Sequence, residues 1–295
     1  MSQPVELTRE ILRGMPLPQP EPDAGSKDAR GGVLVVAGSR ELPGAALLAA
    51  TAVLRAGAGR LRVATGRSLA LALGLAMPEA MVIGLPETAR GGLRPGAGRL
   101  LTSHAAACQS LLIGPGLNGD AGTRDVLRTL LTAHPDKPVI LDAGALTDLG
   151  AQRSILEKRS APVLLTPHAG EMARLLGRDR SAIEEDPLAA AREAAQAFRA
   201  TVIMKGARTH VVSPQGEAWL HEGGHVGLAT SGSGDVLAGI LAGLLARGAE
   251  AAAAALWGVH LHGEAGCRLA EEEGPLGFLA RDLPAQIPRL MAELD

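Results

Sequence analysis

The sequence predicts an α/β fold with a mostly parallel central sheet and helices on both faces. From Gly32 onward, short apolar runs alternate with Ala- and Leu-rich stretches, which is typical of chains built from strand–helix units. The early apolar runs are continuous instead of alternating with polar residues, as in parallel strands buried on both faces. With 46 % hydrophobic residues, the 295-residue chain can bury a large core without disulfides or a structural metal.

The expected elements follow in order along the chain. Residues 1–30 form a polar, Pro-rich lead-in with a short helix at 7–13, and residues 31–295 form a single domain because no linker divides them. Apolar runs are expected as strands at 33–37, 61–64, 80–84, 111–114, 139–142, 163–166 and 202–205. Runs 209–213 and 218–221 flank Pro214-Gln215-Gly216 and are expected to form a hairpin. Helices are expected at 45–56, 123–133, 171–176, 187–200, 235–246 and 249–270.

Composition excludes several classes of function. The 29 basic and 31 acidic residues give a net charge of −2, which argues against a nucleic-acid or membrane-surface binder. Aromatic residues make up 1 % of the chain, too few for the stacking platforms of single-strand binders. The two cysteines, Cys108 and Cys267, lack metal-ligand spacing and indicate a reducing compartment. Because neither a signal peptide nor a long apolar span is visible, we expect a cytoplasmic protein.

Glycine or polar residues follow the carboxyl end of nearly every predicted strand. These positions are Gly38-Ser39, Gly114-Pro115-Gly116, Asp142, Thr166-Pro167-His168 and Lys205-Gly206. A glycine after a strand is usually only a turn. Five such positions at one edge of a sheet are a stronger signal, because open α/β sheets bind ligands at the carboxyl ends of their strands.

The segment Ser231-Gly-Ser-Gly-Asp235 directly precedes a predicted helix. Small residues let backbone N–H groups approach a ligand, and the helix N-terminus adds free donors, so the segment suits phosphate. Asp235 has two interpretations. It is either an ordinary helix cap or a base that takes a proton from a hydroxyl attacking phosphorus.

Three other signals are weaker. Lys205 and Arg208 lie near a sheet end and could pair with phosphates, although taken alone they are better explained by a solvated hairpin turn. His168 follows a strand and has an acid three residues later. The loop 114–119 fits G-x-G-x-x-G, but Pro115 removes a backbone N–H and the motif falls mid-chain, which disfavours an NAD(P)-dependent dehydrogenase.

Several motifs together resemble a known family. They include Val33-Leu-Val-Val-Ala-Gly-Ser39, Leu165-Thr-Pro-His-Ala-Gly-Glu171 and Ala229-Thr-Ser-Gly-Ser-Gly-Asp-Val-Leu237, with further matches at 43–46, 55–59, 114–117, 141–143 and 205–206. In this order, over about residues 27–290, they resemble the ADP-dependent (S)-NAD(P)H-hydrate dehydratases of the ribokinase-like superfamily. The chain departs from the family pattern at three positions. Gly144 and His225 replace the usual Asp and Asn, and Ser233 replaces Thr.

The resemblance implies a ribokinase-like fold and a repair reaction. Hydrated NADH or NADPH (NADHX or NADPHX) takes a phosphoryl group from ADP on its ring hydroxyl and then loses phosphate, giving NAD(P)H, AMP and phosphate. By matching position, the residues expected to contact the hydrate are Ala45, Gly116, His168 and Asp235. Those expected to hold the nucleotide are Lys205, Gly206, Ala207, Arg208, Thr209 and Gly234. Asp235 would be the catalytic base.

The resemblance also implies partners. Mg²⁺ is expected from phosphoryl chemistry, with its ligands unassigned. A homo-oligomer, a tetramer, is implied as well. Many relatives carry an epimerase domain, for which residues 1–30 are too few, so we expect epimerisation of the hydrate by a separate chain. The alternatives are a small-molecule alcohol kinase of the same fold and a nucleotide sensor in which Asp235 only caps its helix.

Overall fold

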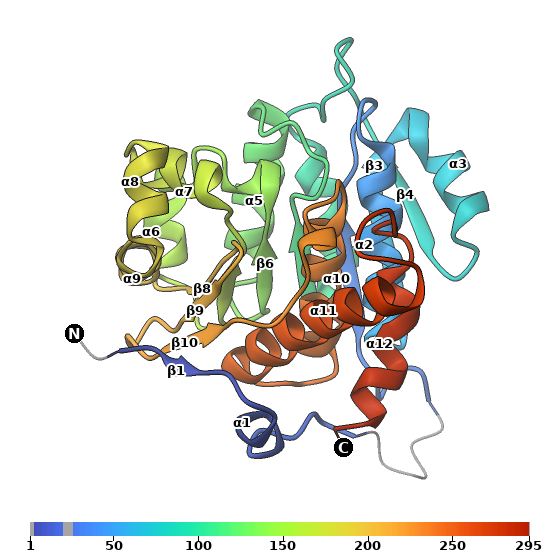
Figure 1. The fold of residues 1–295 in the computed structure, drawn as a ribbon. Helices are drawn as coiled ribbons and strands as arrows, with labels where there is room; N and C mark the ends of the chain where they lie inside the picture. Colours follow the sequence, from blue (N-terminus) through green and yellow to red (C-terminus); the bar gives the residue numbers. More distant parts are fainter. Residues whose placement is uncertain (1–2, 20–25, 295) are drawn as a thin grey trace.

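A computed structural model describes residues 3–19 and 26–294, whose centre is a ten-stranded sheet (Figure 1). The strand order is β1-β10-β9-β8-β7-β6-β5-β2-β3-β4. The strands are β1 (Val5–Glu6), β2 (Gly32–Val36), β3 (Arg60–Gly66), β4 (Met81–Leu85), β5 (Ser110–Ile113), β6 (Val139–Leu141), β7 (Val163–Leu165), β8 (Thr201–Met204), β9 (Thr209–Val212) and β10 (Ala218–His221). All neighbours pair in parallel except β8–β9 and β9–β10, so the predicted mostly parallel sheet and the predicted hairpin, now β9–β10, are confirmed.

Helices cover both faces of the sheet, as the continuous apolar strands predicted. The helices are α1 (Arg9–Arg13), α2 (Pro43–Arg55), α3 (Arg67–Ala76), α4 (Thr102–Ala106), α5 (Ala121–Ala133), α6 (Arg153–Leu156), α7 (Ala169–Leu176), α8 (Arg180–Glu185), α9 (Pro187–Phe198), α10 (Ser233–Ala246), α11 (Ala251–Glu272) and α12 (Leu283–Ala292). In β2, Val33 and Val35 belong to the core cluster that includes residues of α2, α10 and α11, whereas Leu34 and Val36 belong to the cluster that includes residues of α5 and α9. Successive side chains of one strand therefore enter two separate cores.

The segment before β2 adds to the larger core. Thr8 caps α1 by accepting a hydrogen bond from the Ile11 amide, close to the helix expected at 7–13. Strand β1 pairs in parallel with β10, and Leu7, Leu12 and Leu17 are buried against the cluster that includes α11. The boundary expected at residue 30 stays a prediction. Residues 1–2 and 20–25 of the expected lead-in, and residue 295, lie outside the described residues.

Sequence patterns missed several short or proline-containing elements. Strand β1 has only two residues, too few for a periodic pattern. Helix α12 carries a proline in its first turn, where proline is tolerated, and Pro288 in its interior, where proline normally kinks or ends a helix. In the part of the chain that the structure describes, no helix combines the length and apolar character needed to cross a membrane.

Candidate active site

The N-terminus of α10 forms one wall of a polar site at the carboxyl edge of the sheet. Gly232 adopts φ +90° and lets the chain turn into the helix, whose first turn is Ser233, Gly234 and Asp235. The amides of this turn precede the first intrahelical hydrogen bond, from Val236 to Gly232. The amides of Gly234 and Asp235 therefore have no partner within the helix and are available to an anion.

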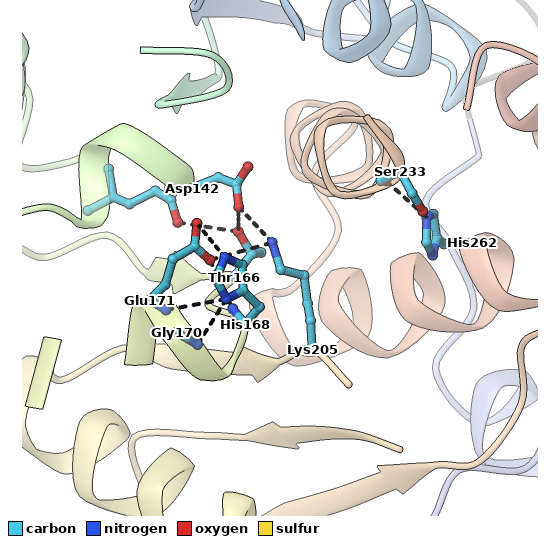
Figure 2. A network of polar contacts seen from close by, with 9 residues as sticks. Asp142, Thr166, His168, Gly170, Glu171, Lys205, Ser233 and His262 are labelled. Atoms are coloured by element: carbon cyan, nitrogen blue, oxygen red, sulfur yellow. Dashed lines mark hydrogen bonds and ion pairs between the residues drawn. The ribbon is translucent and has the colours of Figure 1, made fainter. Parts of the chain in front are cut away.

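Lys205 faces this helix end from β8. A Cβ added at Gly234 would lie 3.2 Å from Lys205 Nζ, so the ammonium lies directly against the helix N-terminus. The ammonium also donates a hydrogen bond of 3.0 Å to Asp142 Oδ1, which follows β6 (Figure 2). Thr166, just after β7, donates to the same oxygen at 2.6 Å. Three adjacent strands thus place their carboxyl-end residues against one another.

Helix α7 contributes a second carboxylate. His168 and Glu171 form a capping box, in which His168 Nδ1 accepts from the Gly170 and Glu171 amides and Glu171 Oε2 accepts from the His168 amide (Figure 2). Glu171 Oε2 lies 3.9 Å from Lys205 Nζ. The Lys205 amide donates to the Pro167 carbonyl at 2.9 Å, which ties β8 to the turn that begins α7.

The charges of this cluster shift two pKa values. Burial, together with the negative charges of Asp142 and Glu171, raises the pKa of Asp235 to about 7, and the Lys205 ammonium partly opposes this rise. Burial alone would lower the pKa of Lys205, but attraction to Asp142 and Glu171 outweighs burial and raises it. At neutral pH the site therefore holds a fixed ammonium beside a carboxyl group that can gain or lose a proton.

A cavity of about 710 Å³ opens beside Lys205 and Gly234. Its volume falls in the range of small-molecule sites. It is lined by His168, Lys205, Gly206, Ala207, Thr209, His221, Gly223, Gly224, His225, Val226, Leu228, Ala229, Thr230, Ser233, Gly234, Leu237, Val259, His262 and Gly263. The cavity therefore combines a charged end with an apolar wall from α10 and α11.

Glycine-rich loops after β2 and β5 meet on the other side of the site. Gly116 adopts φ +66°, and a Cβ added there would lie 2.6 Å from the Ala45 Cβ and 2.8 Å from the Leu42 carbonyl oxygen. The Gly38 amide donates to the Pro115 carbonyl at 2.8 Å. Only glycine permits this approach of the two loops, which brings Ala45 and Gly116 together.

Most of the predicted site residues lie at the cavity or at the contact between Ala45 and Gly116, and one, Arg208, lies apart. His168, Lys205, Gly206, Ala207, Thr209 and Gly234 line the cavity, and Asp235 follows Gly234 in the first turn of α10. Arg208 does not line it. Its guanidinium pairs with Glu222 at 2.7 Å, and both side chains are more than half exposed. A role for Arg208 at the nucleotide stays a prediction.

Sequence reasoning assigned no role to several residues at the site. Asp142, Thr166 and Glu171 were visible only as polar residues near strand ends.

Two departures from the family pattern have a local structural explanation. Gly144, where the family has Asp, has no room for a side chain, because a Cβ there would lie 2.2 Å from the Leu117 carbonyl oxygen. His225 accepts a hydrogen bond from the Gly227 amide and so shapes the loop before α10. Ser233 and His262 meet at the wall of the cavity, a contact that sequence spacing does not signal.

Comparison with known proteins decides the family. Residues 33–289 match the family model described as NAD(P)H-hydrate dehydratase. The chain is 45 % identical, over 98 % of its length and 96 % of the relative's, to a protein of Xanthomonas campestris pv. campestris named ADP-dependent (S)-NAD(P)H-hydrate dehydratase. The chain belongs to the NAD(P)H-hydrate dehydratase family. The resemblance inferred from the motifs is thereby confirmed.

Solved structures agree with this family. The crystal structure of ADP/ATP-dependent NAD(P)H-hydrate dehydratase from Bacillus subtilis, co-crystallised with ATP/Mg²⁺, has a TM-score of 0.83, 31 % identity and full coverage of both chains. A ribokinase-like superfamily protein from Enterococcus faecalis has a TM-score of 0.81 at 29 % identity, covering 98 % of this chain and 96 % of that one. The ribokinase-like fold is therefore confirmed. The bifunctional NAD(P)H-hydrate repair enzyme of Moorella thermoacetica is 41 % identical over 92 % of this chain but only 51 % of its own length.

Proposed function

We propose that this chain catalyses the ADP-dependent dehydration of (S)-NAD(P)H hydrate to NADH or NADPH, releasing AMP and phosphate. The observation that carries the proposal is the position of Asp235. Its carboxyl group, with a pKa of about 7, lies in the first turn of α10 beside free backbone amides and close to Lys205. A base and a phosphate cradle are adjacent there, as transfer of a phosphoryl group to a hydroxyl requires.

The first step moves a proton and a phosphoryl group. Asp235 accepts the proton of the substrate hydroxyl as that oxygen attacks the terminal phosphorus of ADP, and the bond between phosphorus and the bridging oxygen breaks to release AMP. The amides of Gly234 and Asp235 bind the phosphate oxygens, and the Lys205 ammonium offsets their negative charge.

The second step regenerates the reduced ring. The carbon–oxygen bond of the phosphorylated hydrate breaks, phosphate leaves with the bonding electrons, and a neighbouring ring carbon loses a proton to restore the double bond. A phosphate is a far better leaving group than hydroxide. This difference explains why a dehydration is coupled to the consumption of ADP.

The residues at the phosphate site fit Mg²⁺. Among residues 3–19 and 26–294, no three His, Cys, Asp or Glu side chains are grouped so as to form a metal cage. Mg²⁺ seldom needs such a cage, because it is usually held by one or two carboxylates together with substrate phosphates and water. Asp142 and Glu171, both buried beside Lys205, would hold the ion. When bound, Mg²⁺ supplies positive charge to the phosphate oxygens.

The proposal extends to partners and setting. The repair enzyme of Moorella thermoacetica is called bifunctional, which supports cooperation of the proposed activity with an epimerase. The exposed Leu71 and Leu75 on α3, each 77 % exposed, and Met81 on β4 support a homo-oligomer such as a tetramer. The free cysteines Cys108 and Cys267 support a reducing, cytoplasmic setting.

One assay tests the proposed function. The protein is incubated with NADHX and ADP while the absorbance of reduced nicotinamide and the amounts of AMP and phosphate are followed. We expect NADH, AMP and phosphate to form in equal amounts, and none to form without a nucleotide. Repeating the assay with ATP in place of ADP establishes the preferred donor. Accumulation of a phosphorylated product without NADH would assign the chain to the alcohol kinases instead.

A further inference from the structure

His262 and Ser233 form a contact at the wall of the cavity that the mechanism above does not use. His262 lies on α11 and Ser233 on the first turn of α10, and both line the cavity. His262 Nε2 lies 2.9 Å from Ser233 Oγ and 3.0 Å from the Ser233 carbonyl oxygen. Figure 2 shows this pair apart from the network around Lys205. Ser233 is buried and His262 is half-buried at this wall of the cavity.

The two distances decide which ring nitrogen of His262 carries the proton. A carbonyl oxygen can only accept, so the contact of 3.0 Å requires a proton on Nε2. Burial lowers the pKa of His262 to about 4, so the neutral ring carries a single N–H at pH 7. The opposite tautomer would set the Nε2 lone pair against the carbonyl oxygen and would take the serine hydroxyl as its donor. His262 Nε2–H is therefore shared between the carbonyl oxygen and Ser233 Oγ.

With this tautomer, the hydroxyl hydrogen of Ser233 has no acceptor among residues 3–19 and 26–294. Because Ser233 Oγ accepts from His262, its own O–H points away from the ring. The Ser233 amide already donates to the Thr230 carbonyl at 3.3 Å. The hydroxyl is therefore the one donor that Ser233 can offer to a ligand in the cavity, next to the free amide of Gly234.

We propose that His262 is a positioning residue, which holds the Ser233 hydroxyl as a hydrogen-bond donor to a phosphate of the bound nucleotide. This inference rests on the proposed function, because it takes the anion at the α10 N-terminus to be a nucleoside diphosphate. Ser233 touches the phosphate, and His262 acts only through Ser233. The hydroxyl joins the amides of Gly234 and Asp235 and the Lys205 ammonium in binding the phosphate oxygens.

A double-mutant cycle tests the inference, with ADP affinity measured by calorimetry and kcat and KM measured in the NADHX assay. We expect Ser233→Ala and His262→Leu each to weaken ADP binding about tenfold or more, as for a hydrogen bond to a charged group. The double variant should bind ADP no more weakly than Ser233→Ala alone. His262→Gln places an amide N–H near the position of Nε2 and should restore most of the affinity.

The control is His260→Leu, which removes another buried histidine of α11. His260 packs edge-on against His221, with ring centroids 6.0 Å apart, and its variant should leave ADP affinity unchanged. Additive losses in the double variant, equal losses in His262→Gln and His262→Leu, or unchanged ADP affinity in Ser233→Ala would each overturn the inference. If His262→Leu does not fold, the Ser233→Ala and His262→Gln results still decide it. A wild-type protein that binds ADP without regenerating NADH would contradict the proposed function but not the role of His262.

Discussion

The two sides of the candidate site differ in the chemical groups that form them. Around Lys205, charged side chains from β6, α7 and β8 converge within 4 Å, and the carboxyl group of Asp235 has a pKa of about 7. Around Gly116, the closest neighbours are backbone atoms of the loop after β2 and the Ala45 methyl group on α2. The charged side is suited to moving a proton and a phosphoryl group, whereas the glycine side is suited to fitting the shape of a substrate.

This difference leads to a general expectation. Changes on the charged side should alter turnover, nucleotide affinity and pH dependence while leaving the fold intact. Changes on the glycine side should alter substrate KM and stability while leaving nucleotide affinity intact. The following predictions test this division, from the largest effect to the smallest.

Asp235→Asn should cause the largest loss. The variant keeps the size of the side chain but lacks the base, so turnover should fall about 10²–10⁴-fold. ADP affinity should hold or rise, because a negative charge beside the phosphates is removed. NADH regeneration and calorimetry measure the two effects. A stable variant that turns over within about fivefold of the wild type would return Asp235 to a helix-capping role.

The same variant should change stability in a pH-dependent way. The pKa of Asp235 is raised from 3.8 to about 7 on folding, so the folded state holds its proton more tightly than the unfolded chain does. The stability gained from the neutral carboxyl group is therefore lost as the pH rises toward 7. Asp235→Asn should raise the melting temperature at pH 8 and raise it less at pH 5. A shift of equal size at both pH values would contradict the assigned pKa.

Activity should follow the ionisation of Asp235. We expect kcat/KM to rise about tenfold per pH unit below pH 7 and to level off above it, since the base must be deprotonated. Asp142 raises the pKa of Asp235, so Asp142→Asn should move this limb to lower pH. Lys205 lowers the same pKa, so Lys205→Ala should move the limb to higher pH. Shifts in the same direction would contradict the described charge network.

Lys205→Ala should weaken ADP binding by about 1.5–3 kcal/mol, the range for hydrogen bonds to a charged group. Part of the loss comes from leaving Asp142 without its ammonium partner, which adds repulsion of the phosphates. Lys205→Ala combined with Asp142→Asn separates the two causes, because it removes both charges. Unchanged calorimetric affinity in Lys205→Ala would exclude Lys205 from the nucleotide site.

Gly116→Ala tests the glycine side. A Cβ would clash with Ala45 and the Leu42 carbonyl at a positive φ, which costs about 1–3 kcal/mol of stability. We expect a lower melting temperature and a higher KM for the hydrate at unchanged ADP affinity. The matched control is Gly150→Ala, where φ is negative and a Cβ would meet no atom within 4 Å. Equal effects of the two variants would refute the steric explanation.

Arg208→Ala should have the smallest effect. The ion pair with Glu222 is exposed, and such pairs contribute about 0–1 kcal/mol to stability. Because Arg208 does not line the cavity, ADP affinity should change less than about threefold. A loss as large as that of Lys205→Ala would show that Arg208 leaves Glu222 to bind the nucleotide, as the family resemblance implies.

The sequence predicted the sheet well because its strands are local, continuous apolar runs. It did not predict β1 or α12, since a two-residue strand has no period and two prolines obscure a helix. At the site, the α10 N-terminus was visible as five consecutive small or polar residues before a helix. The meeting of Asp142, Glu171 and Lys205 was not, because it depends on the lateral order of β6, β7 and β8. The ion pair between Arg208 and Glu222 was not predictable either, because Glu222 follows β10 and approaches Arg208 only through the β9–β10 hairpin.

The central claim is that the substrate hydroxyl attacks the terminal phosphorus of ADP and leaves as part of phosphate. Hydrate prepared with oxygen-18 in its ring hydroxyl tests this most directly. After turnover with unlabelled ADP, mass spectrometry of the inorganic phosphate and of the water reveals where the label went. The account predicts that the label appears in phosphate, at one labelled oxygen per NADH formed. Unlabelled phosphate with the label in water would contradict it, because direct loss of hydroxide would then accompany separate hydrolysis of ADP.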